Sequence, residues 1–118
     1  MRDHTSLYAW QLADGVALEV YKKATDFWSP ETAAIWHQLR RAALSTPLNL
    51  AEGYRWRPSK RWLFHLRVAN GSALETSELL RYLSRLDPRT GEWINQLLDR
   101  SVRCERMIWG LIRSERKG

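Results

Sequence analysis

The stretch from Pro58 to Leu86, PSKRWLFHLRVANGSALETSELLRYLSRL, repeats apolar side chains with the period of an α-helix. One seam along it has a single polar member, Thr76, and consists of Trp62, Leu66, Ala69, Ala73, Thr76, Leu80 and Leu83. A helix of this length measures about 43 Å, and a one-sided seam on so long a helix needs partners that cover it. We therefore expect this stretch to be one member of a helical bundle.

Turn-forming residues interrupt the helical pattern at Thr25–Pro30, Gly53–Pro58 and Asp87–Gly91. The interruptions leave helical segments that we expect at about Ser6–Lys23, Ser29–Gly53, Pro58–Leu86 and Thr90–Arg113. Because the connections are short, successive helices are antiparallel neighbours. The sequence therefore predicts an all-α fold, an antiparallel up-down-up-down four-helix bundle that forms a single domain over residues 1–118.

Capping residues support these boundaries. Ser29 is a suitable N-cap for the second helix, with Pro30 at its first helical position. Thr90 is a candidate N-cap for the fourth helix. Lys22 and Lys23 lie in the predicted last turn of the first helix, where cations interact favourably with the helix dipole.

The second helical segment is apolar on more sides than one packed face requires. Its apolar residues spread over about 240° of a helical wheel, whereas a helix that covers one core needs a stripe a little wider than 100°. They are Ile35, Trp36, Leu39, Ala42, Ala43, Leu44, Leu48, Leu50 and Ala51. Either the bundle itself buries this helix, or one of its faces docks on another subunit. A four-helix bundle has no central helix, so we favour self-association. Pro47 is expected to kink the helix.

A polar stripe occupies the remaining arc of the second segment. It consists of Gln38, Arg41, Ser45, Asn49 and Glu52. Their side chains form hydrogen bonds readily, so we interpret the stripe as a structural or assembly motif. A small active site around Arg41, Asn49 and Glu52 is the less favoured interpretation, because buried polar networks are commonly structural.

The third segment contains Gly71 and Ser72 in its interior. An interior glycine costs about 1 kcal/mol relative to alanine, so we expect that a close helix approach requires Gly71. Glu75 and Glu78 follow at helical spacing, and each either meets Arg41 or Arg67 across a pair of helices or is solvated.

Two blocks of this sequence resemble a known family. Residues 38–53, QLRRAALSTPLNLAEG, resemble the pattern Q-x-x-R-A-x-x-S-I-x-x-N-I-A-E-G of the four-helix-bundle proteins encoded in 23S rRNA intervening sequences. Thr46 and Leu50 stand where that family usually has Ile. Residues 66–75, LRVANGSALE, resemble its second block, F-L-x-I-A-x-G-S-x-x-E. The resemblance spans about Leu7 to Leu86 and is weaker in the fourth helix.

The resemblance implies a four-helix bundle that assembles as a ring-like homopentamer. The same family includes the accessory variability proteins of diversity-generating retroelements. For those members the resemblance implies a basic surface that engages nucleic acid and a reverse transcriptase. It does not imply an enzyme.

Positive charge is concentrated around the second turn. Residues 37–67 contain seven Lys and Arg and one acid, Glu52, a net +6, whereas the rest of the chain contains twelve of each sign. Arg and Lys supply non-specific phosphate affinity, and exposed aromatic residues stack on unpaired bases. We therefore expect RNA or DNA binding with little sequence preference. The residues we expect to bind are Arg55, Trp56, Arg57, Lys60 and Arg61. The alternative is a solvated basic turn whose arginines stack on its own tryptophan.

Signatures of catalysis are missing. The sequence has no phosphate-binding glycine motif and no Glu-x-x-His pair of the di-iron bundles. The single cysteine, Cys104, excludes an intrachain disulfide and a multi-cysteine zinc site. No apolar run approaches the roughly 20 residues that a membrane span needs. We therefore expect a cytoplasmic, non-enzymatic protein with no cofactor, metal or membrane contact. A pure protein-interaction scaffold is the alternative function.

Overall fold

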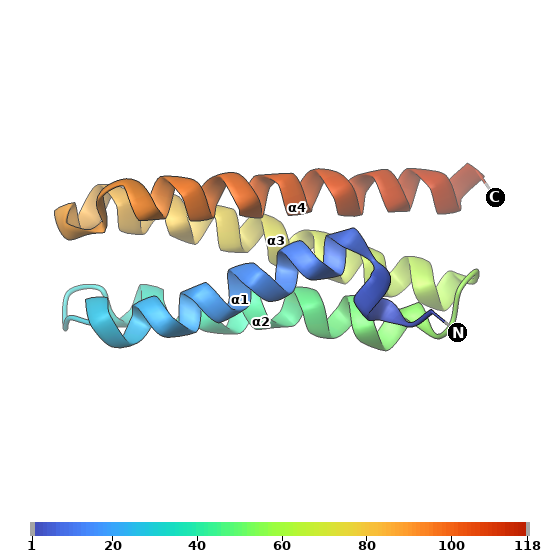
Figure 1. Ribbon diagram of the computed structural model, residues 1–118, viewed down its shortest axis with the longest axis horizontal. Coiled ribbons are helices and arrows are strands. Elements are labelled where there is room, and N and C mark those ends of the chain that lie inside the picture. The colour runs from blue at the N-terminus through green and yellow to red at the C-terminus, as the bar shows by residue number, and fades with distance from the viewer. Residues whose placement is uncertain (1, 118) are drawn as a thin grey trace.

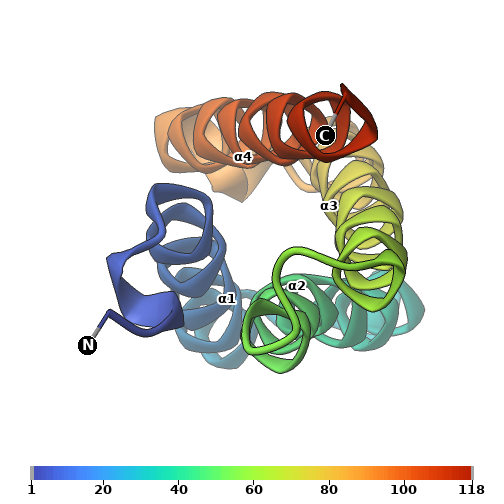
Figure 2. The ribbon, with the colours of Figure 1, turned by 90° about the vertical axis from the view of Figure 1, so that its right-hand side faces the viewer.

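The protein is described by a computed structural model that covers residues 2–117. Its α-helices are α1 (Tyr8–Phe27), α2 (Ala33–Tyr54), α3 (Lys60–Leu86) and α4 (Gly91–Lys117). Short 3-10 turns at His4–Ser6 and Pro88–Thr90 precede α1 and α4. Each helix runs antiparallel to the one before it, and α1 packs against α4 as well as α2 (Figures 1 and 2). The predicted all-α four-helix bundle is confirmed.

Two of the predicted boundaries around the first connection are wrong. Helix α1 continues to Phe27 because its last turns still pack inward: Ala24 is buried, and the Phe27 ring lies 5.0 Å from that of Trp93. Helix α2 begins at Ala33 and not near Ser29. The Ser29 hydroxyl does not cap it, but shares a hydrogen bond of 2.9 Å with the hydroxyl of Thr32 in the turn before the helix.

A serine side chain caps α3, whereas the cap predicted for α4 at Thr90 is wrong. Ser59 caps α3 by accepting a hydrogen bond of 3.2 Å from the backbone N–H of Trp62. The Thr90 hydroxyl instead donates backward to the carbonyl of Asp87 at 2.8 Å. Gly91 opens α4 with a φ of +53°, a value that residues with a Cβ rarely adopt.

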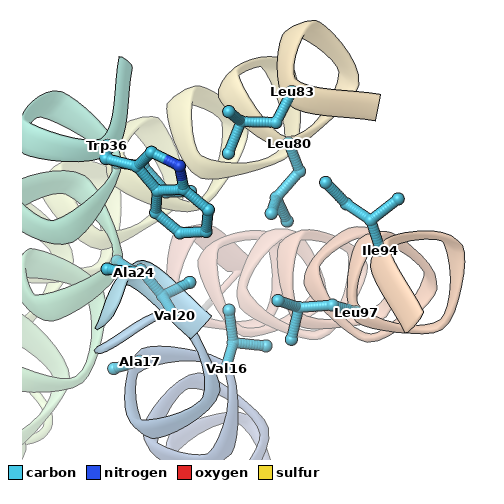
Figure 3. Close-up of a cluster of buried hydrophobic side chains, with 11 residues drawn as sticks. Val16, Ala17, Val20, Ala24, Trp36, Leu80, Leu83, Ile94 and Leu97 are labelled. Carbon is cyan, nitrogen blue, oxygen red and sulfur yellow. The ribbon is translucent and has the colours of Figure 1, made fainter. Parts of the chain in front are cut away.

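The core consists of two apolar clusters, one in each half of the bundle. All seven residues of the predicted α3 seam are buried. Figure 3 shows one cluster, where side chains from all four helices converge around Trp36, Leu80 and Ile94. The second cluster surrounds Trp62 and Ile108 in the other half.

A layer of small and hydroxyl-bearing side chains separates the two clusters. Each helix contributes two residues to it, and together they surround a void of about 10 Å³. They are Ala13, Val16, Ala43, Thr46, Ala73, Thr76, Ser101 and Cys104. Next to this layer, the hydroxyls of Ser77 and Ser101 lie 2.8 Å apart, and Ser77 also donates to the carboxylate of Glu105. The buried hydroxyl groups are thus hydrogen-bonded, as burial requires.

Within the described part of the chain, none of the helices combines the length and apolar character that crossing a bilayer requires.

Candidate nucleic-acid interface

The five residues predicted to bind nucleic acid lie together on the turn between α2 and α3. Arg55, Trp56 and Arg57 follow the end of α2, and Lys60 and Arg61 form the first turn of α3. All five side chains are exposed. Trp56 organises the group, because the guanidinium carbons of Arg55 and Arg61 lie 5.4 and 4.2 Å from the centre of its ring. The structure therefore brings these sequence-predicted residues into one site.

A second arginine–aromatic stack lies beside the first. The guanidinium of Arg57 lies over the ring of Tyr54 at 3.6 Å, and Tyr54 in turn packs edge-on against the buried Trp62. Stacking occupies the face of a guanidinium and leaves its in-plane N–H groups available to acceptors. The stacking that the sequence raised as an alternative is thus present, and it orients these arginines while leaving their donors free.

No carboxylate neutralises these cations within residues 2–117. The ion pairs of the described residues are Arg81–Glu78 and Arg89–Asp87, and both lie in the opposite half of the bundle. Positive charge on the turn is therefore left for solvent or for an external anion.

The end of α4 adds two arginines that the sequence argument missed. Figure 1 shows that the α2–α3 turn and the last turns of α4 lie at the same end of the molecule. The indole of Trp62 donates to the Glu115 carboxylate at 3.2 Å, which ties these two segments together. Arg113 and Arg116 flank Glu115 and are exposed. We call the combined set the basic end; it consists of Arg55, Arg57, Lys60, Arg61, Arg113 and Arg116.

Charge is accordingly divided unequally between the two halves of the bundle. On the side of the basic end, beyond the central layer, residues 2–12, 47–72 and 105–116 contain nine Lys and Arg and four Asp and Glu, a net +5. The other side, residues 17–42 and 77–100, contains eight Lys and Arg and seven Asp and Glu, a net charge of +1. The predicted antiparallel topology could have revealed this, because it puts the last turns of α4 at the same end of the bundle as the α2–α3 turn.

The polar stripe of α2 serves mainly to join α2 to α3. Gln38 donates to the carboxylate of Glu75, and the hydroxyls of Ser45 and Ser72 lie 2.8 Å apart. The amide of Asn49 donates to the Ser45 carbonyl at 2.9 Å, and its oxygen lies 3.1 Å from Nδ1 of His65. Three members of the stripe thus contact side chains of α3.

Arg41 and Glu52, the other members of the stripe, are exposed. The expected encounters of the α3 glutamates with Arg41 or Arg67 are not seen. Glu75 instead accepts from Gln38, and Glu78 pairs with Arg81 one turn along its own helix at 2.9 Å.

The bundle itself buries most of the apolar arc of α2, contrary to the argument that favoured self-association. A corner helix contacts two neighbours, α1 and α3, and this double contact covers an arc wider than one stripe. Trp36, Leu39 and Leu50 are each at most 2% exposed. Only Leu44 and Leu48, which are 39% and 56% exposed, remain as large apolar side chains on the outward side of α2.

Gly71 has no close neighbour within the chain, so the close helix approach expected at this glycine is not made inside the subunit. A Cβ at Gly71 would meet no atom within 4 Å. Gly53 is the glycine at a close approach, since a Cβ there would lie 2.5 Å from the Cβ of His65. On α3, Phe64 and Leu74 are 61% and 51% exposed. The α2–α3 face thus carries exposed apolar side chains and an exposed glycine.

The described residues bring together no group of three His, Cys, Asp or Glu side chains that would hold a metal ion. Cys104 is buried, and its thiol lies 3.6 Å from the carbonyl of Ala9. Burial raises the pKa of this thiol to about 12, with the nearby Glu105 carboxylate contributing in the same direction. A thiol so rarely ionised is a packing group and not a nucleophile.

Comparison with known families gives one match. The sequence model of a family described as 23S rRNA-intervening sequence protein matches residues 5–110, which include α1, α2, α3 and most of α4. The match thus extends beyond the α2 and α3 blocks into the last helix. No curated protein matches the chain.

Proposed function

The chain belongs to the family of 23S rRNA-intervening sequence proteins, and from this membership we propose that it is a homo-oligomeric, cytoplasmic accessory protein without catalytic activity. It binds RNA or DNA through the basic end and shows little sequence preference. A ring of five subunits is the assembly that the family resemblance implies, and a reverse transcriptase is the protein partner if the chain belongs to the retroelement branch.

One observation carries the nucleic-acid proposal. The six cations of the basic end are exposed, and among residues 2–117 no carboxylate pairs with them. Arg55, Arg57 and Arg61 are held against aromatic rings, so part of the entropy cost of ordering them for phosphate contacts is met before binding. Phosphate contacts of this kind supply affinity without sequence information.

Self-association is supported by the α2–α3 face. Leu44, Leu48, Phe64 and Leu74 are exposed on these two helices, and apolar side chains that another subunit covers would be removed from water. Gly71 adds an exposed, helix-interior glycine that nothing within the chain requires. A ring would repeat the basic end in every subunit, so that weak phosphate contacts on one strand reinforce each other.

The direct test is binding of single-stranded RNA and DNA of unrelated sequences across a salt series. The variant Arg55/Arg57/Lys60/Arg61→Ala should bind all sequences more weakly and lower the slope of log K against log salt by up to about 3, since each lost phosphate contact lowers it by 0.7 to 0.9. Its mass in solution should equal that of the wild type.

A matched control removes four cations from the opposite half, Lys22/Lys23/Arg81/Arg85→Ala. It lowers the net charge equally and should retain most of the affinity. If both variants lose the same affinity, binding depends on net charge and not on the basic end. If the wild type does not bind, or binds independently of salt, the nucleic-acid proposal is refuted.

A second candidate function is a protein-interaction scaffold with no physiological nucleic-acid role. It is favoured by the same stacks, because Arg55, Arg57 and Arg61 already have aromatic partners within the chain. This function predicts a stable oligomer and a protein partner that is retained after nuclease treatment. A monomeric mass at micromolar concentration would remove the ring in either case.

A further inference from the structure

A pocket of about 290 Å³ lies between α1 and α2, in the half of the bundle away from the basic end. Aromatic side chains form most of its wall: Tyr21 on α1, Trp28 after the end of α1, and Trp36 on α2. Thr25, His37 and Arg40 add polar side chains, and no Asp or Glu lines it.

Arg40 is a partly buried cation without a hydrogen-bond acceptor. Its guanidinium is held by stacking on the ring of Tyr21 at 4.7 Å, and its Nε is buried with no partner. A buried donor that lacks an acceptor costs about 1–3 kcal/mol, and more when it is charged. The ion pairs of the described residues do not involve Arg40 either, so its positive charge is left for an anion.

Trp36 forms the inner wall of the same pocket, with its indole nitrogen on the side of Leu80 and Leu83 in the core (Figure 3). Trp36 is only 2% exposed. The side-chain N–H groups that are buried without a partner in residues 2–117 belong to Trp36, Arg40 and Trp93. The guanidinium of Arg40, which has no hydrogen-bond acceptor among the described residues, therefore gives the pocket a positive charge that an anionic ligand would complement.

The walls and the size narrow the chemistry of that ligand. Trp28 and Tyr21 are 54% and 37% exposed, so their rings offer flat apolar surface on which a planar group stacks. The volume lies near the lower limit of small-molecule sites, about 300 Å³, and suits one compact ligand. A planar ring joined to an anionic, acceptor-rich group describes a nucleoside phosphate.

We infer that the α1–α2 pocket binds a nucleoside phosphate, with the base against Trp28 and Tyr21 and the phosphate on Arg40. The ligand is either a free mononucleotide or one unpaired nucleotide of a strand, because both present the same base and phosphate. This site is separate from the basic end and does not depend on the proposed function.

The test follows the tryptophan indole N–H signals in ¹H–¹⁵N NMR spectra during titration with AMP, adenosine or inorganic phosphate. Trp28→Phe and Trp36→Phe assign the two pocket signals. We expect AMP to shift the Trp28 and Trp36 signals and to bind at least about tenfold more tightly than adenosine or phosphate, since each of these lacks one of the two contacts. Arg40→Gln should weaken AMP binding by at least the same factor.

Arg41→Gln is the matched control, because Arg41 is adjacent in sequence but exposed and outside the pocket; it should leave AMP affinity unchanged. If Arg40→Gln does not fold, Trp28→Ala in the exposed connection replaces it and should remove the preference of the pocket for AMP over phosphate. A 5′-phosphorylated hexa-adenylate identifies the source: tighter binding than AMP with the same dependence on Arg40 assigns the site to a strand, and equal or weaker binding assigns it to the free nucleotide.

Three results would overturn the inference. They are unshifted Trp28 and Trp36 signals at millimolar AMP, shifts confined to Trp56 at the basic end, and equal effects of Arg40→Gln and Arg41→Gln. Loss of AMP binding in the Arg55/Arg57/Lys60/Arg61→Ala variant would likewise place the nucleotide at the basic end and not in the pocket.

Discussion

The indole N–H of Trp62 donates a hydrogen bond of 3.2 Å to the carboxylate of Glu115, across 53 residues of sequence. Trp62 lies in the first turn of α3 and Glu115 near the end of α4, so this bond joins the two segments that carry the basic end. It also consumes one of the few acceptors there, and the cations beside it stay free of carboxylates within the described residues.

If the basic end is one surface, Arg113 and Arg116 contribute to nucleic-acid binding although they lie far from the α2–α3 turn in sequence. Arg113→Ala/Arg116→Ala should lower the salt slope of binding by up to about 2, which corresponds to two lost phosphate contacts. Fluorescence anisotropy with a labelled single strand at several salt concentrations measures this slope. The control variant Arg81→Ala/Arg85→Ala, at the other end of the bundle, should leave the slope unchanged. If Arg113→Ala/Arg116→Ala also leaves it unchanged, the interface is restricted to the α2–α3 turn.

Substitution by alanine should have opposite effects at the two α2–α3 glycines. Gly53→Ala places a Cβ 2.5 Å from the Cβ of His65 and forces α2 and α3 apart, so we expect a loss of about 1–3 kcal/mol in the free energy of unfolding. Gly71→Ala meets no atom within the chain and should stabilise the isolated subunit by up to about 1 kcal/mol through helix propensity. Chemical denaturation measures both.

The same Gly71→Ala variant tests self-association. If another subunit approaches α3 closely at this glycine, the added methyl group should weaken the oligomer while the subunit itself becomes more stable. Sedimentation equilibrium against the wild type distinguishes the two effects. An unchanged oligomer would show that Gly71 is outside the subunit contact.

Asp87 should make stability depend on pH in the acidic range. Its buried carboxylate accepts from the side chain of Arg89 at 2.7 and 2.9 Å and from the Arg89 backbone at 3.0 Å, and the side-chain hydrogen bonds from Arg89 are the largest cause that lowers the pKa of Asp87 below its ordinary value. Because the pKa is lower in the folded state, the stabilisation is complete above the unfolded pKa of about 3.9 and is lost as the pH falls through the folded pKa.

Asp87→Asn keeps an acceptor for the Arg89 backbone but loses the charge. At pH 7 it should cost about 1–2 kcal/mol of unfolding free energy, and the difference from the wild type should shrink as the pH falls below 4. Urea unfolding at pH 7, 4 and 3 measures it. A difference that stays constant with pH would mean that the carboxylate's charge is not the stabilising element.

Cys104 should be unreactive in the folded protein. With a pKa of about 12, only about one thiol in ten thousand is ionised at pH 8, and burial excludes the reagent as well. A thiol reagent such as 5,5′-dithiobis(2-nitrobenzoate) should therefore react at least about a hundredfold faster in denaturant than in buffer. Because the folded pKa is raised, Cys104 stabilises the fold below the unfolded pKa of about 8.5 and loses this contribution as the pH rises toward 12. Similar rates in buffer and denaturant would contradict the buried placement.

Local patterns predicted the parts of the fold that depend on sequence neighbours. The apolar seam of α3 is buried at every predicted position. The end of α1 and the start of α2 were predicted wrongly because tertiary contacts there outweigh the local turn signals. The packing of Phe27 on Trp93 extends α1, and the Ser29–Thr32 hydrogen bond holds a turn where the sequence favours a cap.

The interpretation of the wide apolar arc of α2 failed for a related reason. A helical wheel measures how much of a helix is apolar but not how many neighbours cover it. Trp36 and Leu50 lie on parts of that arc that the chain itself covers. That Leu44 and Leu48 stay exposed emerged only when the helices were placed next to each other.

By itself, the sequence determined the four helices, the bundle and the five basic and aromatic residues of the α2–α3 turn, because helix periodicity, capping and charge clustering act between residues that are close in the chain. Only the tertiary structure decided that Arg113 and Arg116 join that turn, and that Tyr21, Trp28 and Trp36 line one pocket with Arg40, which has no acceptor among the described residues. Antiparallel packing brings distant segments together, and whether a donor finds an acceptor depends on the side chains that this packing places around it.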